Sequence, residues 1–451
     1  MNKPIVDFVE QYSSKKPIRL HMPGHKGKKI IGPESKDITE IYGADVLYSP
    51  SGIIKESQEN AARIFDTAKT LYSCEGSTLC IKAMLHLVQM CKEKDKGQRV
   101  LILACRNVHK AFLDAVILLD LDVEWIYPDD IKDGIISCRI SPHNLEKKLS
   151  QMENKPDALY ITSPDYLGQM QDIESLSEVC HKYGVLLICD NAHGAYLNFL
   201  ENNLHPIYKG ADICCDSAHK TLPVLTGGAY LHLSKKLSKN YLGNAEKAMS
   251  LFASTSPSYL ILQSLDNMNV LLDSDYMAEL KEAVLRTERL KKHLKESGWS
   301  LVGDEPLKIT IKTKEYGYYG YEIASYLRDN NIECEFADLD YVVLIFSTEL
   351  PKKDYDVVMA VFEKLLKKSK INQIPPAFTK GIKRMGIREA YFSKSEEINV
   401  SKSLGRIFAN SIVSCPPAVP VVICGEEITK ECIQLFKYYG INKCQVLVEG
   451  E

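Results

Sequence analysis

Short apolar runs alternate with amphipathic stretches through the middle of the chain. The apolar runs have the length of buried strands and occupy residues 99–105, 123–127, 158–162, 185–190, 211–216 and 228–233. Stretches with helical spacing lie between them, as at residues 174–184. Continuous apolar strands separated by helices are typical of a mostly parallel sheet covered on both faces. We therefore predict an α/β fold whose ligands bind beyond the carboxyl ends of the strands.

The pattern changes on both sides of this region. The first fifty residues are rich in Gly, Pro, His and Lys, show little periodicity and are expected to form an arm or loop. From about residue 57, helical spacing extends through residue 72 and forms an apolar side with Ala61, Ile64, Phe65 and Ala68. A longer helical stretch, residues 264–298, follows the sheet region and is expected to bridge two domains.

A chain of 451 residues is too long for one ordinary core, so several domains are expected. We predict an N-terminal arm at 1–50, a large ligand-binding domain at 51–275, a small α/β domain at 276–370 and a proline-punctuated C-terminal segment at 371–451. The small domain contains two runs typical of strands, LKITIKT and YVVLIFS.

Composition narrows the function classes. Hydrophobic residues make up 45% and charged residues 25% of the chain, and the net charge is −3, which gives no generally basic surface for nucleic acid. No window approaches the ~20 apolar residues of a membrane span, and the N-terminus lacks the apolar core of a signal peptide. The fourteen cysteines form no C-x-x-C pair. They are expected to be free thiols of a cytoplasmic protein, without a structural metal site.

Polar clusters follow three of the apolar runs. Asp190 ends one run and is followed by Asn191, Ala192 and His193. Another run leads into Ser217-Ala218-His219-Lys220-Thr221, and the run at 99–105 leads to His109. An earlier loop reads Gly76-Ser77-Thr78 and could open a helix. The parallel-sheet prediction places such clusters where ligands bind.

These residue types match what pyridoxal 5′-phosphate (PLP) requires. A lysine amine must reach the aldehyde carbon, and a carboxylate must keep the pyridine nitrogen protonated so that the ring accepts electrons. Lys220 and Asp190 can supply these groups, because thirty positions separate them and one β–α–β unit has about this length. The phosphate needs N–H groups at a helix start and small hydroxyls, which Gly76, Ser77 and Thr78 can provide.

Other residues complete the predicted PLP site. Ala192 lies on the same side of an extended chain as Asp190 and could pack beneath the ring. Ser217 and His219 flank the phosphate from the lysine side, and His109 could stack on the ring. Each residue alone has an ordinary alternative, such as a surface lysine, a helix cap or a loop histidine. Their combination in this order indicates a PLP site.

The same residues give the chain a resemblance to the prokaryotic ornithine/lysine/arginine decarboxylases, in a short form without an extra N-terminal regulator-like domain. The most specific motifs are His21-Met22-Pro23-Gly24-His25-Lys26-Gly27 and Ser217-Ala218-His219-Lys220-Thr221-Leu222-Pro223. The other similar segments are residues 106–110, 190–194, 405–407, 416–420 and 425–429.

The resemblance implies a PLP-dependent transferase-like fold (fold type I) and a decarboxylase of arginine, lysine or ornithine in polyamine-related metabolism. It implies that Lys220 holds PLP as a Schiff base, that Asp190 pairs with the pyridine nitrogen and that His109 stacks on the ring. Lys220 or His109 would protonate Cα of the substrate. The phosphate would be bound by Ser77, Thr78, Ser217 and His219, with His193 near the cofactor. Family members form homodimers or larger oligomers with shared active sites, in which the His21–Gly27 segment is expected to take part.

Three loops depart from the family pattern, at residues 74–80, 162–166 and 226–230. These departures leave the identity of the substrate open. The alternative within PLP chemistry is an aminotransferase or another lyase that acts on a different amino acid. An inactive binding or regulatory relative is the alternative of another class, and the presence of Lys220, Asp190 and His109 speaks against it. The acidic partner of a basic substrate is equally open, with Glu75, Asp45 and Asp165 as candidates.

Overall fold

A computed structural model describes residues 1–92, 97–129, 136–411 and 419–449 of the chain. Two compact units divide the chain: residues 1–93 with 186–281, and residues 94–185 with 282–451. Each unit therefore contains segments that are far apart in the sequence. The division into four segments expected from the sequence stays a prediction.

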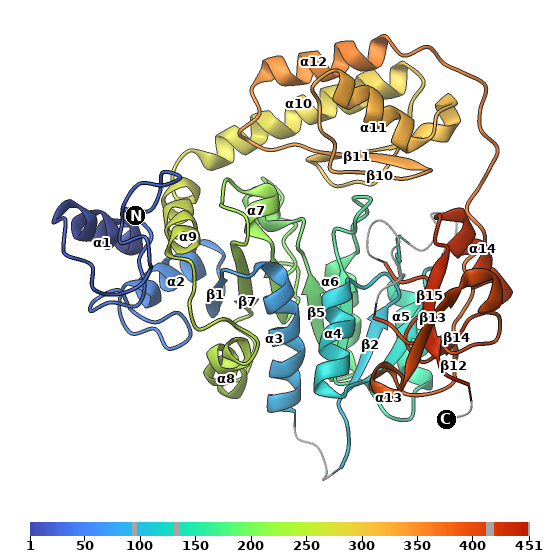
Figure 1. The fold of residues 1–451 in the computed structure, drawn as a ribbon, viewed down its shortest axis with the longest axis horizontal. Helices are drawn as coiled ribbons and strands as arrows, with labels where there is room; N and C mark the ends of the chain where they lie inside the picture. Colours follow the sequence, from blue (N-terminus) through green and yellow to red (C-terminus); the bar gives the residue numbers. More distant parts are fainter. Residues whose placement is uncertain (93–96, 130–135, 412–418, 450–451) are drawn as a thin grey trace. The chain divides into compact units, whose positions relative to one another are not determined.

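The first unit holds four strands of the large sheet in the order β1-β7-β6-β5 (Figure 1). They are β1 (Lys69–Ser73), β5 (Leu186–Asp190), β6 (Ile213–Asp216) and β7 (Ala229–Leu233). β5 and β6 are parallel, and their register pairs Asp190 with Cys215. β7 runs antiparallel to both β6 and β1. The carboxyl ends of β5 and β6 therefore lie side by side.

Helices surround these strands. They are α1 (Pro4–Ser14), α2 (Ile53–Ile64), α3 (Gly76–Cys91), α7 (Ala218–Thr221), α8 (Lys239–Ser250) and α9 (Tyr259–Leu272), with the 3₁₀ helix η1 (Ala195–Phe199). α3 packs against β6, β7 and α8, and α2 packs against β1, α1 and α9. α3 has a long buried face because eight of its side chains, from Leu79 to Val88, are buried. The helix that leads to the second unit is α10 (Tyr276–Glu296).

The second unit holds three parallel strands in the order β4-β2-β3. They are β2 (Leu101–Cys105), β3 (Asp122–Ile126) and β4 (Ala158–Thr162), with helices α4 (Lys110–Leu119), α5 (Pro142–Gln151) and α6 (Ile173–Lys182). The interior positions of β2 and β4 are buried, as expected for strands covered on both faces.

The same unit contains a four-stranded antiparallel sheet in the order β10-β11-β9-β8. Its elements are β8 (Ser300–Val302), β9 (Lys308–Lys312), β10 (Phe336–Ala337), β11 (Tyr341–Ile345), α11 (Gly320–Asp329), α12 (Lys352–Glu363) and the 3₁₀ helix η2 (Thr313–Tyr316). Trp299 stacks on Tyr316 in its core, with ring centroids 3.8 Å apart. The two strands expected within 299–370 are β9 and β11.

The C-terminal segment forms two small antiparallel pairs. β12 (Ile382–Lys383) pairs with β14 (Glu426–Glu427), and β13 (Ser395–Asn399) pairs with β15 (Lys443–Leu447). The remaining elements are α13 (Ile387–Phe392), α14 (Lys430–Tyr438) and the 3₁₀ helix η3 (Val400–Lys402). Arg106, which follows β2, donates to the carbonyl of Pro420 at 2.8 Å and forms an ion pair with Glu426 at 3.4 Å. The Arg106 motif therefore anchors this segment. Residues 415–418 of the proline-rich run lie outside the described residues.

The α/β fold with a mostly parallel, helix-covered sheet is confirmed, because each of the six apolar runs forms a strand of the large sheet. The helix expected from residue 57 to 72 was wrong in its second half. α2 ends at Ile64, Asp66 has a left-handed φ of 53°, and Lys69–Ser73 form β1. Pairing of Leu71 with Leu231 across the sheet outweighed the helical spacing.

Two other expectations are corrected. The first fifty residues are not all loop, because α1 occupies Pro4–Ser14. Proline at the first helical position and Asp266, which accepts the N–H groups of Ile5 and Val6 at 2.9 and 3.0 Å, stabilise its start. The long helical stretch at 264–298 consists of two helices, α9 and α10. Among the described residues, no helix is long and apolar enough to cross a membrane.

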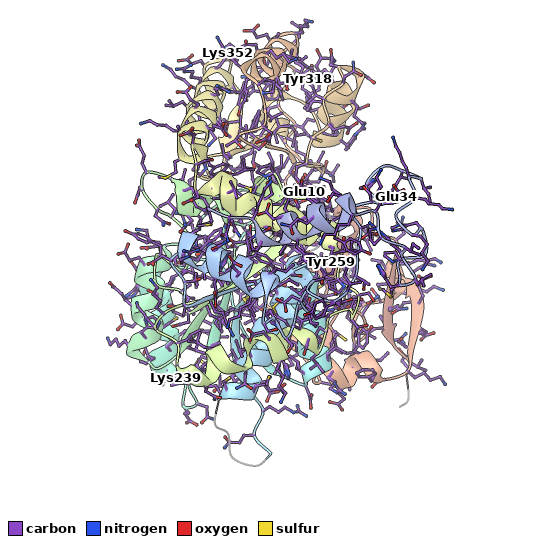
Figure 2. All side chains as sticks on the ribbon, turned by 90° about the vertical axis from the view of Figure 1, so that its left-hand side faces the viewer. Glu10, Glu34, Lys239, Tyr259, Tyr318 and Lys352 are labelled. Carbon is purple, nitrogen blue, oxygen red and sulfur yellow. The ribbon has the colours of Figure 1, made fainter. Side chains whose placement is uncertain are left out.

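The rest of the arm folds as an ordered loop on the first unit (Figure 2). Glu34 accepts the N–H groups of Ile30 and Gly32 at 2.9 and 2.8 Å. The hydroxyl of Tyr259 donates to the carbonyls of Ala44 and Asp45 at 3.0 and 2.9 Å. Exposed apolar side chains remain on this loop: Ile18, Leu20, Ile30, Ile31 and Tyr42.

Candidate active site

Lys220 lies on the short helix α7, immediately after β6. Its Nζ is 3.1 Å from Nε2 of His193, which belongs to the loop after β5. His193 is buried, whereas Lys220 is only partly buried. The structure therefore brings together two predicted site residues from neighbouring strand ends and leaves the lysine amine in reach of a ligand.

Asp190 ends β5 and is 2% exposed. Its Oδ1 accepts the N–H of Ala192 at 3.1 Å and lies 3.7 Å from Sγ of Cys215. Since Asp190 and Cys215 are paired in register, their side chains lie on the same face of the sheet. Ala192 is also buried, as the predicted place beneath a ring requires. The connection from β5 to β6 contains only η1, so the expected intervening α-helix was wrong while the adjacency of the two strands was right.

The loop before α3 meets the loop after β6. Oγ of Ser217 donates to Oγ of Ser77 at 2.8 Å. Gly76 has a φ of 68°, and a Cβ atom at this position would lie 3.9 Å from the ring of His219. Thr78 is exposed in the first turn of α3. A helix N-terminus with hydroxyls from Ser77, Thr78 and Ser217 is a donor set that fits a phosphate group.

His219 is held at the start of β7. Its Nδ1 is 2.8 Å from the carbonyl oxygen of Gly228, and its backbone N–H donates to the same carbonyl at 3.2 Å. Because a carbonyl only accepts, Nδ1 carries the proton in this contact. The ring is thereby fixed beside Gly76.

His109 lies in the second unit. It is exposed and begins α4, where its Nδ1 accepts the N–H of Ala111 at 3.2 Å. This contact gives His109 a helix-capping role. Its expected stacking on the cofactor ring stays a prediction.

The three candidate partners for a basic substrate differ in accessibility. Asp45 accepts N–H groups at the start of α2, including those of Gly52 and Ile54 at 2.8 and 3.0 Å. Asp165 lies in the second unit, is 3% exposed, and burial raises the pKa of its carboxyl to about 6. Glu75 is exposed next to Gly76, and its carboxylate accepts the N–H of Ser254 at 2.7 Å. Glu75 therefore remains the accessible candidate in the first unit.

Tyr48 is a residue that the sequence patterns missed. Its hydroxyl is buried and, within the described part of the chain, has no hydrogen-bond partner. Burial, together with the nearby Cys74 and Glu75, raises the pKa of this hydroxyl well above its usual range. The hydroxyl is thus a neutral donor next to the loop that begins α3. No sequence signal could identify it, since Tyr48 lies in an arm without periodicity.

Comparisons with known protein families and with known proteins identify relatives of the chain. A family model described as "Orn/Lys/Arg decarboxylase, major domain" matches residues 3–310, and one described as "Orn/Lys/Arg decarboxylase, C-terminal domain" matches residues 383–443. The chain is 29% identical to an arginine decarboxylase of Bacillus subtilis, with 96% of this chain and 93% of the relative covered. It is 27% identical to an arginine decarboxylase of Bacillus anthracis, with 96% and 92% covered.

Solved structures show the same fold. The constitutive lysine decarboxylase of E. coli matches with a TM-score of 0.78 and 18% identity, covering 99% of this chain and 82% of the other. An alanine–glyoxylate aminotransferase from Nostoc sp. matches with a TM-score of 0.55 and 16% identity, covering 69% and 85%. The fold-type-I architecture expected from the sequence is therefore confirmed.

Proposed function

Because the chain belongs to the Orn/Lys/Arg decarboxylase family, we propose that it removes the α-carboxylate of arginine with PLP as its cofactor. The enzyme class expected from the sequence, a decarboxylase of basic amino acids, is confirmed by this membership. Arginine is favoured within the class because relatives named arginine decarboxylase match nearly the whole chain. The likeness to lysine decarboxylases at 18% identity supports the fold alone.

The first unit supplies a group for each part of PLP. Lys220 would bind the aldehyde carbon, and Asp190 would hold the proton on the pyridine nitrogen. Ala192 would pack under the ring with His193 close by. The stacking of His109, which belongs to the second unit, is proposed from the family resemblance alone. Bound PLP would supply an electron sink for the pair left when the Cα–carboxylate bond breaks. The phosphate would be held by the N-terminus of α3 at Gly76, Ser77 and Thr78, with Ser217 and His219.

The chain's own groups have defined tasks in this proposal. Lys220 must lose a proton before it can act as a nucleophile, and the imidazole of His193 at 3.1 Å is placed to accept a hydrogen bond from the amine. The buried carboxylate of Asp190 acts more strongly on a protonated ring than an exposed one would, because little water screens it. Lys220 or His109 would return a proton to Cα of the product.

One observation carries the proposal. The segment Ser217–Lys220 contacts both other parts of the site, because Ser217 bonds Ser77 at the start of α3 and Lys220 contacts His193 in the loop after Asp190. A lysine tied in this way to a phosphate-binding loop and to an aspartate loop is what PLP needs. Separate surface roles for these residues would not require the contacts.

A substrate screen tests the proposal. The purified protein with PLP is given arginine, lysine and ornithine, and released CO₂ and the amine product are measured. We expect arginine to give the highest kcat/KM, with Lys220→Ala as the blank. Transfer of the amino group to a 2-oxo acid without CO₂ would instead favour the aminotransferase. Failure to take up PLP or to release CO₂ from any of the three would favour an inactive relative.

We also propose that the protein works in the cytoplasm as a homodimer or larger oligomer with shared active sites. The exposed apolar side chains of the arm, Ile18, Leu20, Ile30, Ile31 and Tyr42, support an interface there. The cysteines of the described residues are free thiols, which suits a reducing compartment. Sedimentation of the protein should give at least a dimer, and Leu20→Asp with Ile31→Asp should shift it toward the monomer.

A further inference from the structure

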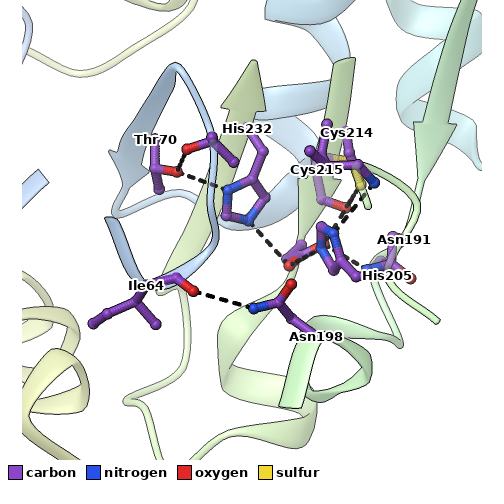
Figure 3. A network of polar contacts seen from close by, with 12 residues as sticks. Ile64, Thr70, Asn191, Asn198, His205, Cys214, Cys215 and His232 are labelled. Carbon is purple, nitrogen blue, oxygen red and sulfur yellow. Dashed lines mark hydrogen bonds and ion pairs between the residues drawn. The ribbon is translucent and has the colours of Figure 1, made fainter. Parts of the chain in front are cut away.

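A second polar cluster is centred on Asp216, the last residue of β6. Figure 3 shows Asn191, His205 and His232 of this cluster. Oδ2 of Asp216 accepts from Nε2 of His205 at 3.0 Å and from Nε2 of His232 at 3.1 Å. Its Oδ1 accepts from Nδ2 of Asn191 at 2.7 Å. Asp216, Asn191, His205 and His232 are each 0% exposed. We call these four residues the Asp216 network.

The proton positions in the network follow from its outer partners. Nδ1 of His205 accepts the N–H of Ile207 at 3.3 Å, so the proton of the neutral ring lies on Nε2. Nδ1 of His232 is 2.9 Å from Oγ1 of Thr70. Burial lowers the pKa of His232, which keeps this ring neutral. Burial by itself would raise the pKa of Asp216, but the two imidazoles outweigh it and hold the pKa well below its usual range. Asp216 is therefore a buried anion that accepts hydrogen bonds from Asn191, His205 and His232, and Sγ of Cys214 lies 3.7 Å from its Oδ1.

A metal ion is the other way to read two histidines and one aspartate. The three ligand atoms lie within 4.8 Å of one another. However, both Nε2 atoms point their protons at the carboxylate when the rings are neutral, and Nδ1 of His205 already accepts from the backbone. A metal at Nε2 would have to displace these protons. The hydrogen-bond arrangement favours a network without metal.

The Asp216 network joins the two loops of the proposed active site. Asn191 stands between Asp190 and Ala192, and because side chains alternate along extended chain, it reaches the face opposite Asp190. Asp216 directly precedes Ser217, and Lys220 follows on α7. The hydrogen bond from Asn191 to Asp216 thus links the residue after Asp190 to the residue before Ser217.

The turn that carries His193 closes tightly around Asn191. The N–H of Gly194 donates to the carbonyl of Asn191 at 2.8 Å. A Cβ atom at residue 194 would lie 2.0 Å from the side-chain oxygen of Asn191, so only glycine fits there. The position of the Asn191 amide therefore fixes the turn, and the turn fixes His193 against Lys220.

We propose that Asp216, oriented by His205 and His232, is a positioning residue: through Asn191 it sets the distance between the Asp190–His193 loop and Lys220. It contacts neither PLP nor substrate. The inference rests on the proposed function only in that the two positioned loops are the ones assigned to PLP. It adds to that proposal a cause for the alignment of the lysine and the aspartate.

The test compares Asp216→Asn with Asp266→Asn as the matched control. Asp266 is also a fully buried carboxylate of the first unit, but its partners, Ser57 and the N–H groups of Ile5 and Val6, lie in α1 and α2. The main readout is the rate at which an amine-reactive reagent modifies Lys220 in the cofactor-free protein. Peptide mass spectrometry follows this rate across pH. The second readout is the PLP dissociation constant, measured with thermal midpoints of all variants.

We expect Asp216→Asn to change the Lys220 modification rate at fixed pH by about tenfold, because the amine is no longer held against His193. We expect it to raise the PLP dissociation constant by about 10- to 100-fold, as for other groups that orient a binding residue. His232→Gln should act in the same direction. Asp266→Asn should leave Lys220 reactivity and PLP affinity within about twofold of the wild type, although its thermal midpoint changes.

Equal Lys220 reactivity and PLP affinity in Asp216→Asn and the wild type would overturn the inference and leave the network a purely structural role. A stoichiometric metal that is present in the wild type and lost in His205→Gln would also overturn it. If Asp216→Asn does not fold, Asn191→Ala removes only the amide bridge and should show the same changes at smaller size. Lys220 reactivity is read without PLP or arginine, so inactivity toward arginine would count against the proposed function and not against the network.

Discussion

Asp190 and Asp216 end neighbouring strands with their side chains on opposite faces of β5 and β6. Near Asp190, Lys220 is partly exposed, and Oγ of Ser217 donates to Oγ of Ser77. Around Asp216, the carboxylate and the two histidines that donate to it are fully buried. Groups that must exchange partners when a ligand binds stay accessible, while groups that hold the loops in place are buried and paired. The comparison shows that the accessible groups of the proposed site and the buried groups that hold its loops are two separate sets of side chains.

Removal of the reactive amine should have the largest effect. We expect Lys220→Ala to lower decarboxylation by about a thousandfold or more, because no other group in this arrangement replaces a covalent nucleophile. Its thermal midpoint should stay near that of the wild type, since Lys220 is only partly buried. Lys239→Ala, at the exposed start of α8, is the control and should keep full activity. Equal activity of the two variants would place the reaction elsewhere.

Removal of the charge on Asp190 should have the next largest effect. Asp190→Asn keeps the shape of the side chain but cannot hold the pyridine proton, so we expect kcat to fall by about a hundredfold. Unlike Asp216→Asn, it should leave the modification rate of Lys220 in cofactor-free protein unchanged, because the Asp216 network is intact. Stopped-flow rates of decarboxylation and modification rates of Lys220, measured in Asp190→Asn and Asp216→Asn, sharpen the contrast between Asp190 and the Asp216 network. Similar losses in both readouts for both variants would erase it.

Removal of either serine hydroxyl proposed to bind the phosphate should have a smaller effect. Ser77→Ala and Ser217→Ala each remove one hydroxyl next to the N-terminus of α3, and we expect each to raise the PLP dissociation constant by about tenfold, the usual worth of a hydrogen bond to an anion. Fluorescence titration of cofactor-free protein measures it. Saturating PLP should restore most of kcat. A kcat that stays low at saturation would mean that these hydroxyls do more than bind phosphate.

The smallest effect concerns pH, and it contrasts two buried carboxylates. Burial raises the pKa of Asp266 to about 6, despite its bond from Ser57, so the folded state holds more protons than the unfolded chain between about pH 4 and 6. Stability from this group is present at low pH and is lost as pH rises through about 6. The pKa of Asp216 is lowered, so its contribution is full above about pH 4 and is lost only as pH falls below it.

Thermal midpoints between pH 4 and 8 check this contrast. Relative to the wild type, Asp266→Asn should gain stability as pH rises, by about 1 to 3 kcal/mol in free energy of unfolding between pH 4 and 7. Asp216→Asn should be destabilised by a constant amount above about pH 5. Parallel pH curves for the two variants would contradict the assignment of their ionisation states.

The sequence patterns predicted the strands, because buried strands are continuous apolar runs, and they pointed to the motifs at the strand ends, whose role in binding PLP stays a prediction. Lys220, Asp190 and Ser217 are in such motifs. The Asp216 network left no sequence pattern. His205, His232 and Asn191 come from different elements and meet through the pairing of β5, β6 and β7. β1 was hidden because the helical spacing of the preceding residues continues through Leu71 and Tyr72, and the pairing with β7 overrides it.

The account depends most on Lys220 being the residue that binds PLP. Wild-type protein loaded with PLP is treated with borohydride, which fixes the lysine–cofactor linkage, and digested peptides are analysed by mass spectrometry. We predict that the added pyridoxyl mass is found on the peptide that contains Lys220 and is absent in Lys220→Ala. A pyridoxyl group on another lysine, with arginine decarboxylation intact, would contradict the account.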